Sequence, residues 1–384
     1  MSKTIEERLK LFDTYLERTG MDKKQYQYDG VRWILNNELR DDPVQNIRGG
    51  IIADEMGLGK TIMMIGTMLC NFVPKTLVVV PPVLIDQWFV QIYRTTGHKA
   101  LIYHGEEKKN TTLEDLQKAK IVICTYAAVT LTRDQIANRE LSDLHKIQWS
   151  RLVCDEAHHL RNAGTTRYFG VRILQANIRW LVTGTPIQNR KKDFYNLCNI
   201  LRLPASFYTD IDALKLQARE FILKRTKKQV GIQIADLFVG KNLVNWQNVK
   251  EKELSEELHS ALKFSSARSK SDQIVSAFSG SGFALPIILR ARQSCIYPKL
   301  MAGQLNKLVE AGIMSDYTQY KEAFNCSSKL DYAVKKILDR KDNGCGKIIF
   351  CHFREEIDEI ATRLRSGGMT KVATIGGHQF YEGQ

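Results

Sequence analysis

GGIIADEMGLGKT, residues 49–61, is the stretch that decides the fold. Its first part, GGIIA (49–53), is a short apolar run with the length and composition of a strand buried on both faces. Its second part, DEMGLGKT (54–61), is a glycine-containing loop that leads into the helical run IMMIGTML (62–69). A strand, such a loop and a helix in this order are typical of a phosphate-binding loop, because backbone N–H groups of the loop and of the first helical turn point at an anion.

The residue types of this loop suit a triphosphate. Gly57 and Gly59 let the backbone turn and come close to the phosphate oxygens. The Lys60 ammonium can reach the β- and γ-phosphates, and the Thr61 hydroxyl can bind Mg²⁺. The general pattern has glycine where this chain has Asp54, so the strict pattern is not met, and a chance surface turn is the alternative interpretation. The predicted ATP-binding residues of the loop are Asp54, Glu55, Met56, Gly57, Leu58, Gly59, Lys60 and Thr61.

Short apolar runs recur after this loop, each followed by a turn-like or helical segment. They are TLVVV (76–80), IVIC (121–124), RLVC (151–154) and RWLVT (179–183). This rhythm predicts an α/β lobe with parallel strands that are joined by helices and buried on both faces. Trp33, Trp88 and Trp180 fall in apolar segments and are predicted core residues. Because functional residues of such sheets lie just past the carboxyl ends of the strands, the residues after each run are candidate site residues.

An acid pair follows one of these runs. RLVC leads into Asp155 and Glu156, at a strand end that is predicted to lie near the phosphate loop. Asp155 can hold the Mg²⁺ of a nucleotide together with Thr61, and Glu156 can orient and polarise the attacking water. Adjacent acids on a surface are usually only solvated charge, but the position after a buried strand favours a site. The two motifs together predict hydrolysis of a nucleoside triphosphate, with Lys60, Asp155 and Glu156 as catalytic residues.

The composition excludes several classes of protein. Hydrophobic residues make up 43% and charged residues 26% of the 384, which is ordinary for a folded domain and excludes wholesale disorder. The longest apolar run, residues 77–85, contains two prolines and is too short for a membrane span, and the start of the chain has no signal-peptide pattern. The eight cysteines form no CxxC pair, which indicates a reducing compartment rather than a zinc site or a secreted disulfide framework. The net charge of +14 has its excess between residues 51 and 300, which fits either a phosphate-bearing partner or a merely soluble basic surface.

Three blocks carry a family resemblance. DEMGLGKT, DEAH (155–158) and LVTGTPIQNR (181–190) resemble motifs I, II and III of superfamily 2 helicase-like ATPases, and more narrowly those of the Snf2 family of double-stranded-DNA translocases. Further blocks resemble that family's segments in the family's order from about residue 24 to 377. They are YQYDGVRWIL (26–35), LVVVPPVLIDQW (77–88), ICTYAAV (123–129), FILKRTKKQV (221–230), LRARQSCIYPKL (289–300), and SSKLDYAVKKIL with GKIIFCHF (327–353).

The resemblance implies roles for residues outside the phosphate loop. Gln27 would hydrogen-bond the adenine. A second group would couple the nucleotide state to lobe closure, namely His158, Thr183, Gly184, Thr185 and Gln188. Two loops at the sheet edge would contact one strand of a DNA duplex through its backbone, namely Pro81 with Pro82 and Thr125 with Tyr126. Ordinary turns that end strands are the alternative interpretation of both groups.

The resemblance also implies a domain organisation. We expect an N-terminal helix at 1–23, a first RecA-like ATP-binding lobe at 24–230, a helical protrusion at 231–325, and the start of a second RecA-like lobe at 326–384. Strand-like runs at 346–351 and 371–375 fit the beginning of that second lobe. The family's second lobe continues with motifs V and VI, which supply arginines to the γ-phosphate, and such an arginine is worth roughly 10³–10⁵ in rate. We therefore expect a fragment or a naturally short protein with weak or no turnover, which the downstream segment would restore.

The function implied is ATP-dependent movement on double-stranded DNA, with ATP and Mg²⁺ as ligands. The motion would displace or remodel a nucleosome, a polymerase or a repair complex, in chromatin remodelling, transcription or DNA repair. A nuclear or nucleo-cytoplasmic location without a membrane is expected. Two alternatives stay open: a DNA or RNA helicase that separates strands, and a nucleotide- or DNA-binding module that does not hydrolyse ATP.

Overall fold

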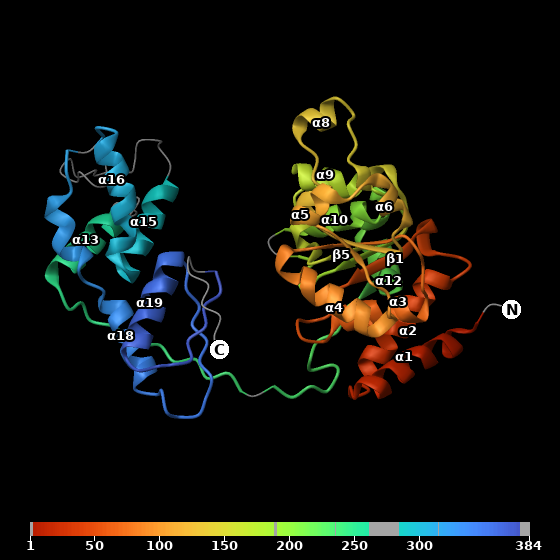
Figure 1. Cartoon of the computed structure of the whole chain (residues 1–384), viewed down its shortest axis with the longest axis horizontal. Helices are drawn as coiled ribbons and strands as arrows, with labels where there is room; N and C mark the ends of the chain where they lie inside the picture. Colours follow the sequence, from red (N-terminus) through yellow and green to blue (C-terminus); the bar gives the residue numbers. More distant parts are fainter. Residues whose placement is uncertain (1–2, 188–189, 235, 261–283, 314, 377–384) are drawn as a thin grey trace. The chain divides into compact units, whose positions relative to one another are not determined.

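The structure is a computed structural model that describes residues 3–187, 190–234, 236–260, 284–313 and 315–376. The chain divides into two compact units, Met1–Asp236 and Leu237–Gln384, and each is described by itself (Figure 1). The four domains expected from the sequence stay a prediction. None of the helices in the described ranges has the length and apolar character that a membrane crossing needs.

The first unit is built on a parallel sheet. In its described residues the strand order is β3-β4-β2-β5-β6-β1-β7, and every neighbouring pair is parallel. The strands are β1 (Arg48–Ile52), β2 (Thr76–Val80), β3 (Leu101–Tyr103), β4 (Ile121–Thr125), β5 (Gln148–Asp155), β6 (Gln175–Val182) and β7 (Ile222–Leu223). The predicted parallel α/β lobe is thus confirmed. The short strands β3 and β7 were not predicted, because two or three residues carry no readable pattern.

Helices cover both faces of this sheet (Figure 1). One apolar cluster joins the sheet to α1–α4, and another joins it to α6, α9, α10 and α11. The valines and isoleucines of β2 and β4 are fully buried because both of their faces meet helices. The helices are α1 (Ile5–Thr19), α2 (Gln25–Leu39), α3 (Lys60–Cys70), α4 (Ile85–Thr96), α5 (Gly105–Asn110), α6 (Leu113–Lys118), α7 (Tyr126–Val129), α8 (Arg133–Ala137), α9 (Thr166–Ile173), α10 (Lys191–Ile200), α11 (Ala205–Thr209) and α12 (Ile211–Phe221). Short 3-10 helices lie at Val44–Asn46, Pro82–Leu84, Asp143–Lys146 and Ala157–Leu160.

The amino-terminal helix packs on the sheet lobe. Thr4 and Glu7 form a capping box that starts α1, and Gly20 ends the helix with a positive φ of 64°. Leu9 and Phe12 of α1 are fully buried in the same apolar cluster as α3. Helix α1 therefore brings the loop between α1 and α2 close to the start of α3, where the phosphate loop ends.

A buried ion pair fixes α2 against the sheet. Glu38 of α2 and Arg151 of β5 both have fully buried side chains, and Arg151 Nε donates to Glu38 Oε1 over 2.7 Å. Trp180 Nε1 donates to the same carboxylate oxygen at 2.8 Å, and Asn71 Nδ2 donates to the other at 2.8 Å. A buried carboxylate is tolerated only when it is paired and hydrogen-bonded in this way. The pair sets the position of α2, which carries Gln27.

The second unit is helical in its described residues. Its helices are α13 (Val249–Ser260), α15 (Ala284–Ile296), α16 (Ala302–Glu310), α17 (Lys321–Phe324), α18 (Ser328–Leu338) and α19 (Arg354–Ser366), with 3-10 helices at Pro298–Met301 and Thr318–Tyr320. One apolar cluster joins α13, α15, α16 and α17, and a second joins α18 to α19. The buried Glu251 of α13 accepts a hydrogen bond from Ser328 N at the start of α18.

The strands expected at 346–351 and 371–375 are not formed. Both segments lack secondary structure, and no strand occurs in the described residues of the second unit. Ile348, Phe350 and Ile375 expose more than four fifths of their surface. An apolar run becomes a strand only when its backbone groups pair with a neighbour, and these two segments make no such ladder. The sequence-based prediction of strands was therefore wrong for this structure.

Candidate active site

The carboxyl ends of three neighbouring strands meet at one edge of the sheet. Strands β5, β6 and β1 are adjacent, and Val182 is level with both Asp155 and Ile52 in the strand register. The phosphate loop follows β1, the acid pair ends β5, and Thr183 follows β6. Parallel pairing thus brings together three motifs that are far apart in the sequence.

The phosphate loop has the backbone geometry that its glycines allow. Gly57 and Gly59 have φ angles of 88° and 80°, in the region that favours glycine, and α3 begins at the next residue. A Cβ atom on Gly59 would lie 2.3 Å from Gln27 Nε2, so this position also needs the absence of a side chain. The Gln27 amide donates to the carbonyl of Leu58 over 3.2 Å. Gln27, for which the family resemblance implies an adenine contact, therefore lies against the loop.

Lys60 is the cation at the start of α3. Its Nζ donates to the backbone carbonyl of Asp54 over 3.0 Å, across the loop. A Cβ atom on Gly184 would lie 3.4 Å from this Nζ, so the loop after β6 also reaches the lysine. An ammonium held by one carbonyl can turn to an anionic ligand at little cost, because a neutral acceptor binds it more weakly than a phosphate does.

Three hydrogen bonds hold Asp155, two at its buried carboxylate and one at its main-chain carbonyl. Trp88 Nε1 donates to Asp155 Oδ2 over 2.8 Å, the Glu156 N–H donates to Oδ1 over 2.9 Å, and the Tyr126 hydroxyl donates to the Asp155 carbonyl over 2.7 Å. Burial raises the pKa of Asp155, and the Trp88 and Glu156 hydrogen bonds oppose this. A cation bound beside Asp155 would stabilise its ionised form.

Glu156 has an unusual backbone. Its φ of 50° and ψ of 47° lie in the left-handed region, which a residue with a side chain seldom adopts. The Glu156 Oε2 atom lies 3.1 Å from His158 Nδ1, and both side chains are partly exposed. Strained backbone of this kind is often kept at functional sites. The turn at Glu156 leaves its own carboxylate partly exposed next to the buried carboxylate of Asp155.

These residues line one cleft of about 680 Å³. Of the sequence-predicted residues, those that line it are Gln27, Met56, Gly57, Gly59, Lys60, Thr61, Asp155 and Glu156. Others that the sequence did not single out include Met21, Asp22, Lys24, Gln87 and Gln91. The latter come from the loop before α2 and from α4, and no motif marks them, because they reach the cleft only through helix packing.

Three loop residues predicted to bind ATP face elsewhere. Asp54 is fully buried and forms an ion pair with Arg225, and Leu58 is fully buried with its carbonyl toward Gln27. Glu55 lines a different pocket together with Lys227. Their side chains are therefore not offered to a ligand in the cleft. The pairing of Arg225 with Asp54 was missed because 171 positions separate the two residues.

Thr183, Gly184 and Thr185, which follow β6, pack against the phosphate loop, and none of these three lines the cleft. Thr183 is fully buried, its N–H donates to the Ile52 carbonyl, and its hydroxyl oxygen accepts from Thr185 N over 3.3 Å. Gly184 lies beside Met56, because a Cβ on Gly184 would be 3.0 Å from Met56 Cγ. Gln188, which the sequence grouped with these residues, lies outside the described residues.

The residues expected to contact DNA differ in exposure. Pro82 is exposed at the start of its 3-10 helix, and Pro81 is half-buried. Thr125 and Tyr126 are buried, and burial raises the pKa of Tyr126 well above its ordinary value. The Tyr126 hydroxyl is thus a neutral donor to Asp155 rather than a free surface group. A DNA contact through these two side chains does not fit this arrangement, whereas the two prolines remain accessible.

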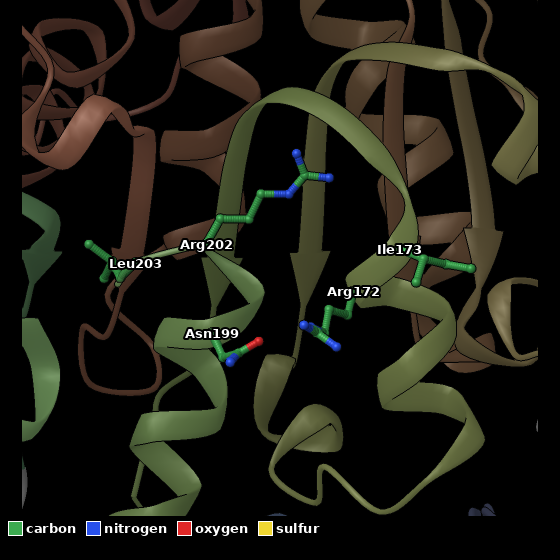
Figure 2. Close-up of a pocket in the computed structure, with 5 residues that line it drawn as sticks. All are labelled: Arg172, Ile173, Asn199, Arg202 and Leu203. Atoms are coloured by element: carbon green, nitrogen blue, oxygen red, sulfur yellow. The ribbon is translucent and has the colours of Figure 1, made fainter. Parts of the chain in front are cut away.

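A second pocket of about 430 Å³ lies where α9 and α10 end. Figure 2 shows its lining residues, Arg172, Ile173, Asn199, Arg202 and Leu203. Arg202 donates to the Leu174 carbonyl and to Gln175 Oε1, over 3.3 and 3.0 Å. These contacts lie at the start of β6, at the edge of the sheet away from the phosphate loop. Arg202 therefore serves to satisfy backbone and side-chain oxygens where two helices end.

Comparisons with known proteins point to one family. The model of the SNF2-related domain matches residues 26–300. The probable global transactivator of Orgyia pseudotsugata multicapsid polyhedrosis virus is 27% identical, over 90% of this chain and 69% of the viral protein. The DNA repair protein RAD5 of Debaryomyces hansenii is 28% identical, over 76% of this chain and 29% of RAD5. Human chromodomain-helicase-DNA-binding protein 7 is 25% identical, over 90% of this chain and 11% of that protein.

A solved structure is also similar, the Sulfolobus solfataricus SWI2/SNF2 ATPase core in complex with dsDNA. It has 23% sequence identity and a TM-score of 0.46, and the match covers 89% of this chain and 69% of that one. This chain spans only a small part of RAD5 and of the human protein. The family model covers well over half of the chain and includes the phosphate loop, the acid pair and the loop after β6. The chain therefore belongs to the SNF2-related domain family.

Proposed function

We propose that this chain hydrolyses ATP and couples the hydrolysis to movement on double-stranded DNA. The observation that carries the proposal is the single cleft that brings Lys60 and Thr61 together with Asp155 and Glu156. A cation, a hydroxyl, a buried carboxylate and an accessible carboxylate are the set that in-line phosphoryl transfer to water requires. The volume of about 680 Å³ is in the range of small-molecule sites.

The residues of the cleft also fit Mg²⁺. The Thr61 hydroxyl and the Asp155 carboxylate would hold it, and both supply the oxygen donors that Mg²⁺ prefers. When bound, Mg²⁺ offsets negative charge on the phosphates. Lys60 would bind the terminal phosphates, Gln27 the adenine, and Glu156 would accept a proton from the attacking water. The Trp88 and Tyr126 hydrogen bonds would keep Asp155 in place during the reaction.

The DNA part of the proposal rests on the family and on the charge. Family membership favours an ATPase that acts on duplex DNA, and the net charge of +14 favours a polyanionic partner. The exposed Pro82 lies at the carboxyl edge of β2, near the nucleotide cleft. Contacts from such an edge position a phosphate backbone without reading bases. Remodelling of a nucleosome, a polymerase or a repair complex, in the nucleus or nucleo-cytoplasm, is the use we propose for the motion.

ATP hydrolysis with and without blunt duplex DNA tests the proposal. We expect the duplex to stimulate hydrolysis and a triplex-forming third strand to be displaced, because a moving enzyme removes what is bound ahead of it. A strand-separation assay on the same duplex should show no unwinding. Efficient unwinding would instead favour a helicase, and nucleotide binding without any hydrolysis would favour a binding module.

Trp88→Phe should weaken Mg²⁺–ATP binding by about tenfold or more, because the change removes a hydrogen bond to a charged group that is worth roughly 1.5–3 kcal/mol. Protons compete with Mg²⁺ for Asp155, whose pKa is already raised by burial. The variant should therefore lose affinity at a higher pH than the wild type as the pH falls. Titration of a fluorescent ATP analogue across pH measures this.

Trp33→Phe is the matched control for Trp88→Phe. Trp33 Nε1 donates to the Arg219 carbonyl rather than to a residue of the cleft. Its variant should bind Mg²⁺–ATP as the wild type does. Equal affinities for the Trp88 variant and the wild type at every pH would exclude the role given to Trp88.

A further inference from the structure

Backbone hydrogen bonds join the segment after β7 to the phosphate loop. Ala53 N donates to the Leu223 carbonyl over 2.7 Å, and Glu55 N donates to the Arg225 carbonyl over 2.9 Å. These bonds extend the β1–β7 pairing past the strand ends and into the loop. The first part of the phosphate loop therefore has the segment 224–228 as its direct neighbour.

Side chains reinforce this junction. Asp54 Oδ1 accepts from Arg225 N at 2.8 Å and from Arg225 Nε at 3.2 Å, and Oδ2 accepts from Nε and from the terminal nitrogen of Arg225. The Asp54 side chain is fully buried, whereas that of Arg225 is 18% exposed. Glu55 Oε2 accepts from Lys227 N over 2.8 Å. Because an unpaired buried carboxylate is costly, Asp54 holds Arg225 firmly in place.

The guanidinium of Arg225 also reaches two helices of the nucleotide cleft. It donates to the Tyr26 carbonyl in α2 and lies 3.3 Å from Met63 Sδ in α3. Gly30 makes room for it, because a Cβ there would lie 3.0 Å from the Arg225 terminal nitrogen. One side chain thus contacts α2, the phosphate loop and α3.

The contacts of Asp54 connect Arg225 to the phosphate-binding lysine. The Asp54 carbonyl accepts from Lys60 Nζ, and the Asp54 carboxylate accepts from Arg225. If Lys60 turned to a bound triphosphate, its bond to the Asp54 carbonyl would be lost while the Asp54 carboxylate still bonded Arg225. Asp54 would then be the residue through which a change in the cleft reaches segment 224–228.

We propose that Arg225 is a positioning residue through which ATP binding and the conformation of segment 224–228 control each other. The inference rests on the proposed function, since it assigns a regulatory output to the same cleft. The segment leads toward Asp236, where the first unit ends. A conformational change of the segment on ATP binding can therefore affect the chain that follows the first unit. Such coupling is reciprocal: if ATP stabilises the segment, loosening the segment weakens ATP binding by the same factor.

The first experiment compares ATP affinity in wild type, Arg225→Lys and Arg202→Lys with a fluorescent ATP analogue and Mg²⁺. Lysine keeps the charge of Arg225 but cannot bond Asp54 and Tyr26 together, so we expect affinity to fall by about 5- to 50-fold, in the usual range of coupling. Arg202→Lys makes the same chemical change at the other edge of the sheet and should leave affinity unchanged. Equal affinities in all three proteins would overturn the proposal.

The second experiment measures amide hydrogen exchange of residues 222–232 with and without Mg²⁺–ATP. In the wild type, ATP should slow exchange of the Arg225 and Lys227 amides, which donate to Asp54 and Glu55. In Arg225→Lys this ATP-dependent slowing should be lost even where the protein stays folded. If Arg225 only stabilised the structure, exchange in the variant would be faster both with and without ATP, and ATP would slow it as much as in the wild type. That result would contradict the proposal.

Glu55→Ala provides a variant that spares the buried pair. Glu55 is partly exposed, so its removal should not unfold the lobe, yet Lys227 N loses its acceptor. We expect the ATP-dependent slowing at Lys227 to disappear, with a smaller loss of affinity than in Arg225→Lys. Wild-type slowing in this variant would overturn the proposal. If the wild-type chain fails to bind ATP at all, the proposed function fails instead, and the two failures are thereby distinguished.

Discussion

Lys60→Ala is expected to lower ATP affinity by at least about 100-fold and to abolish detectable hydrolysis. Lys60 is the cation at the first turn of α3 that lines the cleft, and among the described residues its Nζ donates to the Asp54 carbonyl. Removal of one partner of a buried charged pair costs roughly 2–5 kcal/mol, and the phosphates of ATP would lose that partner. Calorimetric titration with Mg²⁺–ATP measures the change.

The folding of the Lys60 variant should be close to that of the wild type, because only the bond to the Asp54 carbonyl is lost. Lys99→Ala is a suitable control, since Lys99 is exposed and does not line the nucleotide cleft. Its variant should bind ATP normally. Wild-type affinity in Lys60→Ala, with a normal unfolding midpoint, would show that the phosphate-loop assignment is wrong.

The candidate catalytic centre was largely predictable from sequence because its parts are local. The glycines, the lysine and the threonine of residues 57–61 are contiguous, and the acid pair directly follows a buried strand. Consecutive parallel strands of one sheet have their carboxyl ends at the same edge. The sheet order then places β5, β6 and β1 side by side. The prediction thus needed only local pattern and one topological rule.

The residues that hold the candidate catalytic residues and the phosphate loop in place were not predictable, because they act through tertiary contacts. Trp88 was expected to be a core residue, and it is fully buried, but its N–H reaches Asp155, which is 67 positions away. A buried tryptophan N–H needs an acceptor, so a partner could have been expected, although not its identity. The departure of Asp54 from the general loop pattern is explained only by Arg225, which supplies the counter-charge.

In the second unit, a strand-like sequence pattern does not lead to a strand. Residues 346–351 have a strand-like composition, yet they form no ladder, whereas the residues just after them form the helix α19. A helix satisfies its hydrogen bonds within itself, so a local pattern is enough to specify it. A strand needs a neighbour, and apolar side chains such as Ile348 and Phe350 stay exposed without one.

Glu156→Gln is expected to slow ATP hydrolysis by about 10²–10⁴-fold, the usual contribution of a general base. Glutamine keeps the shape of the side chain but cannot accept a proton from water. Asp155, Lys60 and Thr61 are unchanged, so Mg²⁺–ATP affinity should stay close to the wild-type value. The effect should therefore fall on kcat rather than on KM. Single-turnover hydrolysis of radiolabelled ATP, with the protein in excess, measures even slow cleavage.

Asp155→Asn makes the contrasting change one residue earlier. It removes the negative charge that would hold Mg²⁺, so binding of Mg²⁺–ATP should weaken together with the rate. Glu140→Gln, at an exposed position outside the cleft, is the control for the Glu156 variant. Loss of rate with retained binding in Glu156→Gln alone assigns proton acceptance to Glu156, because its carboxylate is the accessible member of the pair and Asp155 is the buried one. Equal cleavage by Glu156→Gln and the wild type would mean that water is activated by another group.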